Sequence, residues 1–143
     1  MSTEENKALV LRFIAAEEQG DIALLGQLMT PDFRLHLPGS PEPLDGESTR
    51  QFFAMFHAAF PDSSRTIEDQ IAEGELVATH VSMSGTHRGE FQGIPPTGRQ
   101  VTITGTGIHR VVDGRIAEHW PQPDLLGLMR QLGVVPTLEK AGA

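Results

Sequence analysis

A chain of 143 residues has room for one compact domain, and its formal net charge of −8 argues against nucleic acid or an anionic membrane as the main partner. The lack of cysteine excludes disulfides, thiolate metal ligands and a cysteine nucleophile. No apolar run is long enough to cross a bilayer, and the acidic start MSTEENKALVL lacks the pattern of a secretory signal, so we expect a cytoplasmic protein.

The first half of the chain predicts three helices and one strand. Ser2 and Glu5 have the spacing of a capping box at the start of the first helix, which Gly20 ends. Asp21 starts a second, shorter helix. The alternation of apolar and polar residues in DFRLHLPG predicts a short strand. A third helix rich in phenylalanine then ends at Pro61.

The second half predicts a sheet followed by one helix. SRTIEDQIAEGELVATHVSMSGTH indicates two strands around residues 73–74, and VTITGTGIHRVVDGRIAEHW indicates a hairpin whose Asp-Gly turn at 113–114 suits positive φ angles. A last helix is expected over residues 125–132, with Gly133 as its C-terminal stop. The order predicts an α+β fold, with residues 1–143 as a single domain. A curved antiparallel sheet packed over the N-terminal helices would enclose a ligand cavity.

Three residues are candidates for acid/base chemistry in such a cavity. His109 follows two small residues at period two, Gly105 and Gly107, which leave space for a ligand, although a packed histidine with local hydrogen bonds would give the same pattern. His36 lies on the first strand, and the alternative to a catalytic role is an exposed or edge-strand histidine. Asp124 precedes the last helix, where it would act either as a general acid/base or as a plain N-cap.

Other side chains are expected to bind the substrate, and no bound metal or organic cofactor is expected. The sequence has no HExxH motif, no close histidine pair on one helix face and no phosphate-binding glycine loop. The expected substrate contacts are Trp120, Phe53, Phe56, Ile103, Met83 and His87.

Two stretches, GTHRGEFQGIPPTG and DGRIAEHWPQPDLLGLMRQLG, closely resemble the SnoaL-like polyketide cyclases, also called the ester cyclase group. The first half of the chain fits the same pattern more loosely, so the resemblance covers nearly the whole chain. This group belongs to the nuclear-transport-factor-two-like superfamily. The resemblance implies a cone-shaped α+β barrel with a deep pocket, commonly assembled into homodimers through the sheet.

The resemblance also implies a chemistry, which is aldol ring closure without a metal or organic cofactor. A late aspartate acts as general acid/base in the founding cyclases, and pocket histidines stabilise the enolate. On this sequence these residues match Asp124, His36 and His109. The chain departs from the pattern at Pro121, where relatives often carry an acidic or amide residue, at Gly107, where they often carry a polar one, and at His109, where they often carry an aromatic one.

Several functions therefore stay open. The first is a cofactor-independent acid/base enzyme that cyclises or isomerises a hydrophobic carbonyl compound. The second is a non-catalytic domain that binds a small hydrophobic molecule, in which Asp124 is only a helix cap. The third is an epoxide hydrolase or dehydratase, which wants an aspartate that activates water with arginine and asparagine partners. The sequence weakens the third alternative because its one asparagine, Asn6, lies in the first helix.

Overall fold

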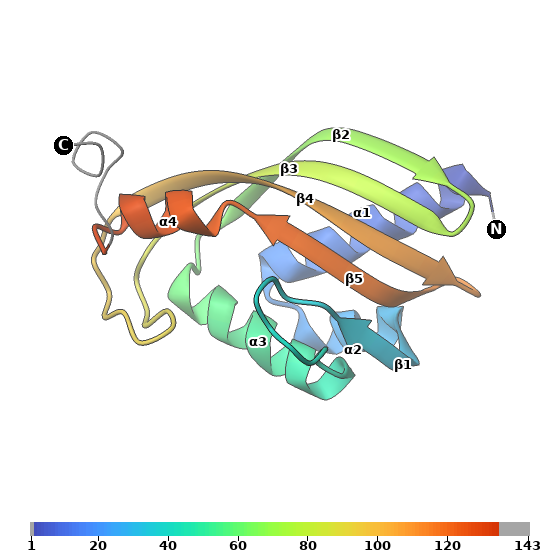
Figure 1. Cartoon of the computed structure of the whole chain (residues 1–143), viewed down its shortest axis with the longest axis horizontal. Helices are drawn as coiled ribbons and strands as arrows, with labels where there is room; N and C mark the ends of the chain where they lie inside the picture. Colours follow the sequence, from blue (N-terminus) through green and yellow to red (C-terminus); the bar gives the residue numbers. More distant parts are fainter. Residues whose placement is uncertain (1, 135–143) are drawn as a thin grey trace.

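The computed structural model describes residues 2–134, which contain four helices and five strands (Figure 1). Most of the helical residues precede the sheet, as the sequence pattern predicts for an α+β fold. In chain order the elements are α1 (Thr3–Gln19), α2 (Ile22–Leu28), β1 (Met29–Leu35), α3 (Gly46–Ala59), β2 (Ser64–Glu73), β3 (Leu76–Thr86), β4 (Gln100–Val112), β5 (Arg115–Pro123) and α4 (Leu125–Gln131).

The strands form one sheet in the order β1-β5-β4-β3-β2. Three neighbouring pairs are antiparallel, whereas β1 pairs with β5 in parallel. The expectation of a fully antiparallel sheet is therefore corrected at this edge. The physical reason is that the two strands are far apart in the chain, so no tight hairpin fixes their relative direction.

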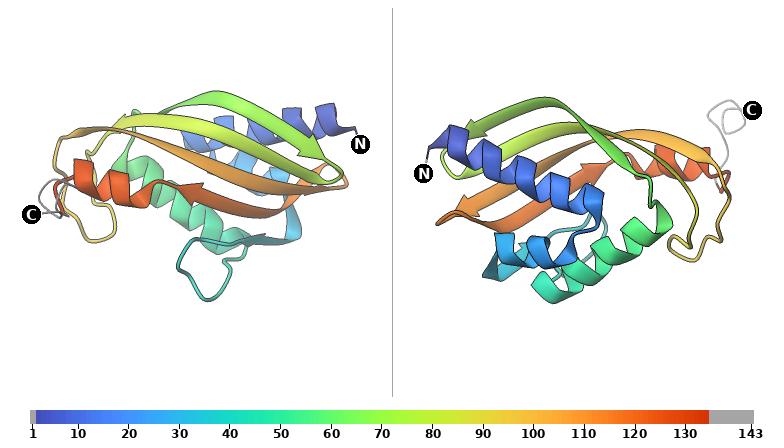
Figure 2. Two further views of the ribbon diagram at one scale, coloured as in Figure 1. Left: turned by 45° about the horizontal axis from the view of Figure 1, so that its top comes forward. Right: turned by 180° about the vertical axis from the view of Figure 1, so that it is seen from behind.

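The sheet is curved and remains open, and α1, α2 and α3 cover one of its faces (Figures 1 and 2). Irregular register bends it at three places, including the β4–β5 pair between Arg110 and Val111. The short helix α4 continues from the end of β5 and packs against β4. None of the helices within residues 2–134 is long and apolar enough to cross a membrane.

Two groups of buried apolar side chains hold the helices against the sheet. One contains Phe13 and Phe33 under the β1 side, and the other contains Phe60, Phe91 and Leu128 near α4. Burying one large apolar side chain stabilises the fold by about 1.5–3 kcal/mol, so these groups supply much of the driving force. Members of both groups line one cavity, which places it between them.

Local patterns confirm most of the predicted element ends. The Ser2 hydroxyl accepts the backbone N–H of Glu5, whose carboxylate accepts the N–H of Ser2 in return, so the capping box is present. Asp113 and Gly114 adopt φ values of 50° and 76°, as the tight hairpin turn requires. Gly133 follows α4 with a φ of 82°.

Candidate active site

A cavity of about 220 Å³ lies between the curved sheet and the helices. Its wall is mostly apolar, and α3 contributes Phe53 and Phe56 while the sheet contributes Met83 and Ile103. These four residues are among the predicted substrate contacts, and the structure brings them together around one space. The volume exceeds the roughly 150 Å³ of a cavity that binds benzene, so a ligand of one or two rings suits it.

Two histidines form the centre of the sheet side of this cavity. His109 on β4 and His119 on β5 are partners across the antiparallel pair, and both line the cavity. Their rings stack with centroids 3.8 Å apart at an interplanar angle of 17°. The Phe13 ring packs edge-on against both imidazoles, at 5.6 and 6.1 Å between centroids. The pair is thus held by the core on one side and open to the cavity on the other.

Burial keeps both imidazoles neutral. His109 and His119 are only 2% and 5% exposed. Removal from water lowers the pKa of His109 to about 3. The same effect, with a smaller contribution from His109, lowers the pKa of His119 well below its ordinary value of 6.5. At neutral pH each ring therefore carries a single N–H donor and no charge.

Three of the four ring nitrogens of this pair are not used by the described part of the protein. Both nitrogens of His109 and Nδ1 of His119 are buried without a hydrogen-bond partner among residues 2–134. A Cβ atom at Gly107 would lie 3.1 Å from Nε2 of His119, so the glycine keeps that nitrogen uncrowded. Buried polar groups normally have partners, so these nitrogens are suited to a hydrogen bond with a ligand oxygen.

The helix side of the cavity carries a carboxylic acid. Glu17 on α1 lines the same cavity as the histidine pair. Burial raises the pKa of the Glu17 carboxyl to about 7, and the positive charge of Arg65 only partly opposes this effect. Its acid and base forms are therefore both populated near neutral pH, as proton transfer requires.

Arg65 on β2 is the cation whose charge acts on the pKa of Glu17, and it also lines the cavity. Its guanidinium carbon lies 5.8 Å from the centroid of the Phe56 ring. Nη1 is buried and has no hydrogen-bond partner in the part of the chain that the structure describes. No ion pair joins this guanidinium to a carboxylate of those residues.

Asp124 lies at the start of α4, between Pro123 and Leu125, which both line the cavity. Its carboxylate accepts the backbone N–H of Gly127 at 2.9 Å, and the residue is exposed and outside the cavity lining. The helix-cap alternative therefore describes its geometry. A catalytic role for Asp124 stays a prediction, since no observed contact tests it.

The cap gives a simple stability prediction. We expect Asp124→Ala to lower the free energy of unfolding by about 1 kcal/mol, because the N–H of Gly127 loses its acceptor. Asp124→Asn should nearly preserve stability, because an asparagine oxygen caps equally well. Urea unfolding followed by circular dichroism measures both variants. Equal losses for the two substitutions would contradict a capping role.

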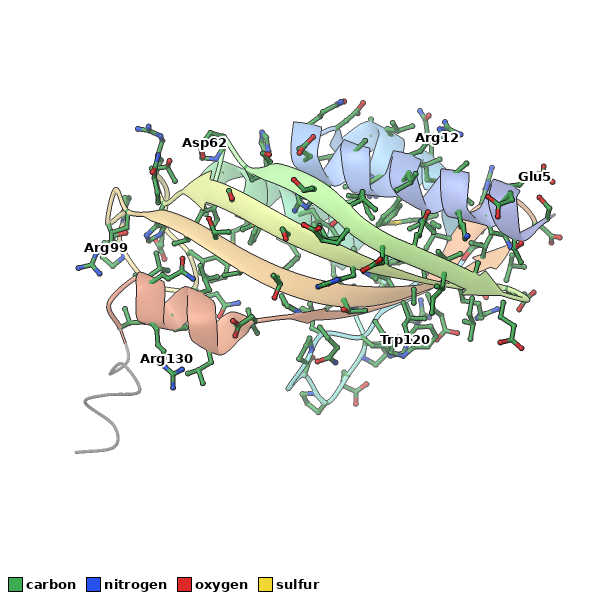
Figure 3. All side chains as sticks on the ribbon, turned by 90° about the horizontal axis from the view of Figure 1, so that it is seen from above. Glu5, Arg12, Asp62, Arg99, Trp120 and Arg130 are labelled. Carbon is green, nitrogen blue, oxygen red and sulfur yellow. The ribbon has the colours of Figure 1, made fainter. Side chains whose placement is uncertain are left out.

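His36 and Trp120 lie on the opposite face of the sheet from the cavity. Nε2 of His36 is 2.8 Å from Oε2 of Glu118, and its ring stacks on Trp120 with centroids 5.0 Å apart. Neither residue lines the cavity, although the sequence predicts both for the site. The reason is the alternation of side chains along β5, which directs His119 inward and its two neighbours outward. Trp120, which lies on β5, is labelled in Figure 3.

His87 also lies outside the cavity lining and supports a loop instead. Its ring is fully buried and stacks on Phe60 with centroids 5.4 Å apart. Nδ1 accepts the backbone N–H of Thr97 at 3.2 Å. This fixes the loop between β3 and β4, which in turn supplies Phe91 and Gln92 to the cavity wall. Direct contact between His87 and a substrate stays a prediction.

Sequence reasoning missed Glu17, Arg65 and the cavity role of His119. Glu17 could have been found, because it follows Phe13 and Ile14 at the spacing that places three residues on one helix face. Nothing in the sequence around Arg65 distinguishes it from other strand arginines. His119 required knowledge of the β4–β5 register.

Comparisons with known proteins agree with this architecture. A family model described as SnoaL-like polyketide cyclase matches residues 7–132. Nogalonic acid methyl ester cyclase from Streptomyces nogalater is 36% identical over 84 residues, which cover 58% of this chain but only 63% of that relative. Aklanonic acid methyl ester cyclase DauD from Streptomyces sp. strain C5 is 33% identical over 133 residues, covering 87% of this chain and 80% of DauD. The crystal structure of IdmH, a candidate polyketide cyclase from Streptomyces antibioticus, superposes with a TM-score of 0.79 at 37% identity, covering 90% of this chain and 99% of IdmH.

Proposed function

Because the chain belongs to the SnoaL-like polyketide cyclase family, we propose that it is an acid/base enzyme acting on a hydrophobic carbonyl compound. The reaction is an aldol-type cyclisation or an isomerisation that requires no bound cofactor. The observation that carries this proposal is one apolar cavity that contains both a carboxylic acid with a pKa of about 7 and a neutral histidine pair.

In this proposal Glu17 is the acid/base group. Its carboxylate form removes a proton from the carbon next to the substrate carbonyl, and the electrons move to the carbonyl oxygen to give an enolate. The enolate carbon then attacks a second carbonyl of the same molecule. The resulting alkoxide takes the proton back from Glu17, so the enzyme ends unchanged. A desolvated carboxylate is a stronger base than one in water, which favours the first step.

The histidine pair stabilises the negative oxygen. A neutral imidazole N–H of His109 or His119 donates a hydrogen bond to the oxygen on which charge develops. Such a donor gains strength in the transition state, because the oxygen carries more charge there than in the bound ketone. The enolate-stabilising role that the sequence predicts for His109 is thus kept, with His119 as its neighbour.

The departures noted in the sequence support a carboxyl on the helix side. Gly107 and Pro121 are partners in the β4–β5 ladder, and both line the cavity. They are the positions where relatives often carry polar residues, so this part of the wall offers no titratable side chain here. The roles predicted for Asp124 and His36 stay predictions, and both residues lie outside the cavity lining.

A homodimer is also part of the proposal. The outer face of the sheet exposes apolar side chains, of which Ile71 is 71% and Ile108 is 39% exposed. Pairing through this face would cover them while leaving the cavity on the other face free. Analytical ultracentrifugation tests this arrangement. A charged substitution, Ile108→Glu, should convert a dimer to a monomer.

The enzymatic function is tested with defined carbonyl compounds. Nogalonic and aklanonic acid methyl esters, which the relatives' names specify, are tested for cyclisation by chromatography. The bicyclic ketone 2-tetralone is tested for exchange of its α-protons in D2O by NMR, which reports the first step alone. We expect exchange well above the buffer rate. Binding of the ketone without any exchange or cyclisation would instead favour the non-catalytic binding domain, in agreement with the capping geometry of Asp124.

A further inference from the structure

The guanidinium of Arg65 is a cation in a mostly apolar wall, and no carboxylate within residues 2–134 forms an ion pair with it, although Glu17 lies near enough to feel its charge. Nη1 is buried without an acceptor, and no carboxylate of the described residues forms an ion pair with the side chain. A buried donor that loses its water without gaining an acceptor destabilises the folded state, and more so when the group is charged. The arrangement is therefore unfavourable for the protein alone and favourable once a ligand supplies the acceptor.

The main chain and the side chain of Arg65 are each fixed by one contact. The backbone N–H of Arg65 donates to Oε1 of Glu18 at 2.5 Å, which ties the start of β2 to the end of α1. The guanidinium carbon lies 5.8 Å from the Phe56 centroid, within the range of a cation–π contact with α3. A positioned guanidinium presents its N–H groups as a planar fork that matches the two oxygens of a carboxylate or of an enolised dicarbonyl.

Glu17 offsets the charge of this cation only in those molecules in which its carboxyl is ionised. It lines the same cavity, but no ion pair joins it to Arg65. Because its pKa is about 7, it is neutral in a large fraction of molecules near neutral pH. The positive charge of Arg65 therefore stays available to a ligand in the cavity.

We propose that Arg65 is a recognition site for an anionic oxygen of the ligand, so that the substrate is an acidic carbonyl compound, a carboxylate or an enolate, rather than a plain apolar ketone. This inference deepens the proposed function, and it rests on that function only in taking the cavity as the ligand site. The apolar wall binds the rings of the ligand, and Arg65 fixes their orientation through the anionic group.

Calorimetric titration with two probes of equal size tests this inference. One probe is 2-naphthoate, which is anionic at pH 6, where Glu17 is mostly neutral, and the other is 2-naphthamide, which is its neutral counterpart. We expect the wild-type protein to bind naphthoate at least tenfold more tightly than naphthamide, because hydrogen bonds between charged groups are stronger than those to a neutral amide. Arg65→Met should abolish this preference and leave naphthamide affinity nearly unchanged. Arg65→Lys should keep part of it, because the charge remains but the planar fork is lost.

Arg12→Met is the matched control, because it removes the same charge from an exposed position on α1 (Figure 3). It should bind both probes as the wild type does. Equal affinity of the wild type for the two probes, unchanged naphthoate binding by Arg65→Met, or no naphthoate binding at all would overturn the proposal. Failure of the proposed enzymatic function shows separately, as the expected preference for naphthoate without α-proton exchange or cyclisation of any of the tested carbonyl compounds.

Discussion

Replacing Glu17 with glutamine is expected to reduce the exchange of 2-tetralone α-protons by about 100-fold or more, the usual contribution of a general base. Glutamine keeps the size of the side chain in the cavity wall and removes only its capacity to accept and return a proton. NMR measurement of exchange rates in D2O gives the result directly. The residual rate would report the contribution of the histidine pair and of binding alone.

The pH dependence of exchange gives a second signature of the same group. The carboxylate is the active form, so the wild-type rate should rise with pH and level off above the Glu17 pKa of about 7. A base with the ordinary glutamate pKa of 4.5 would already be ionised, so the exchange rate would not change with pH around pH 7. Any residual activity of the Glu17→Gln variant should lack the transition near pH 7.

Two comparisons make the Glu17 result specific. Glu4→Gln changes the same residue type on the same helix, but at an exposed position paired with Lys7 at 3.5 Å. It should exchange protons at the wild-type rate. Asp124→Asn is the competing case, because it keeps the helix cap and removes the base that the sequence predicts. Full activity of Glu17→Gln together with loss of activity in Asp124→Asn would assign the proton transfer to Asp124.

Stability measurements on the Glu17→Gln variant test whether unfolding causes a loss of its activity. A carboxyl whose pKa is raised in the folded state is disfavoured there as a carboxylate. As pH rises from 4.5 to 7, ionisation of Glu17 therefore destabilises the wild type relative to the Glu17→Gln variant. The variant should be at least as stable as the wild type at pH 8.

The elements of this fold were predictable because their signals are local. The capping box at Ser2 and Glu5 and the positive φ angles of the Asp113-Gly114 turn depend on residues a few positions apart. The parallel pairing of β1 with β5 was not predictable in this way, because alternation along one strand contains no information on the direction of its partner.

The candidate site was harder to predict because it depends on one irregularity. A two-residue turn at 113–114 pairs Val112 with Arg115, and a regular ladder from there would place His109 opposite Glu118. The observed shift between Arg110 and Val111 advances β5 by one residue. It places His109 opposite His119, and the two rings stack. Hydrophobic periodicity does not reveal such a bulge, although the bulge creates the pair.

Asp124 illustrates a different limit of sequence reasoning. An aspartate before an apolar helix fits an N-cap and a cavity-edge acid equally well, because both need an exposed loop position with a free carboxylate. Only the direction of the side chain separates the two, and the hydrogen bond to Gly127 gives that direction. Glu17 shows the converse, since its place on the apolar face of α1 is a stronger sign of a desolvated acid.

The histidine pair is expected to make the fold sensitive to mild acid. Both rings have folded-state pKa values far below the ordinary 6.5, so the unfolded chain binds more protons below that pH. Stability is therefore complete above about pH 6.5 and falls as the pH decreases, by about 1.4 kcal/mol per pH unit for each proton. Glu17 acts in the opposite direction between pH 7 and 4.5, because its folded form binds the extra proton. As the pH falls from 6 to 5, the unfolded wild type should therefore bind about one proton more than the folded form. Its free energy of unfolding should fall by about 1.4 kcal/mol over this pH unit.

Variants separate the two opposing contributions, because the remaining titratable groups are shared and cancel in the comparison. Glu17→Gln removes the extra proton that the folded form binds at Glu17. The free energy of unfolding of this variant should therefore fall by roughly 2.7 kcal/mol per pH unit, which corresponds to two protons. His109→Phe keeps an aromatic ring under Phe13 and removes one titrating imidazole, so its slope should be close to zero. Urea unfolding at closely spaced pH values between 5 and 6 measures all three slopes. A wild-type slope in the His109→Phe variant would mean that the buried imidazole of the folded protein is already protonated in this range, and a cationic ring could not act as the neutral donor that the proposed chemistry requires.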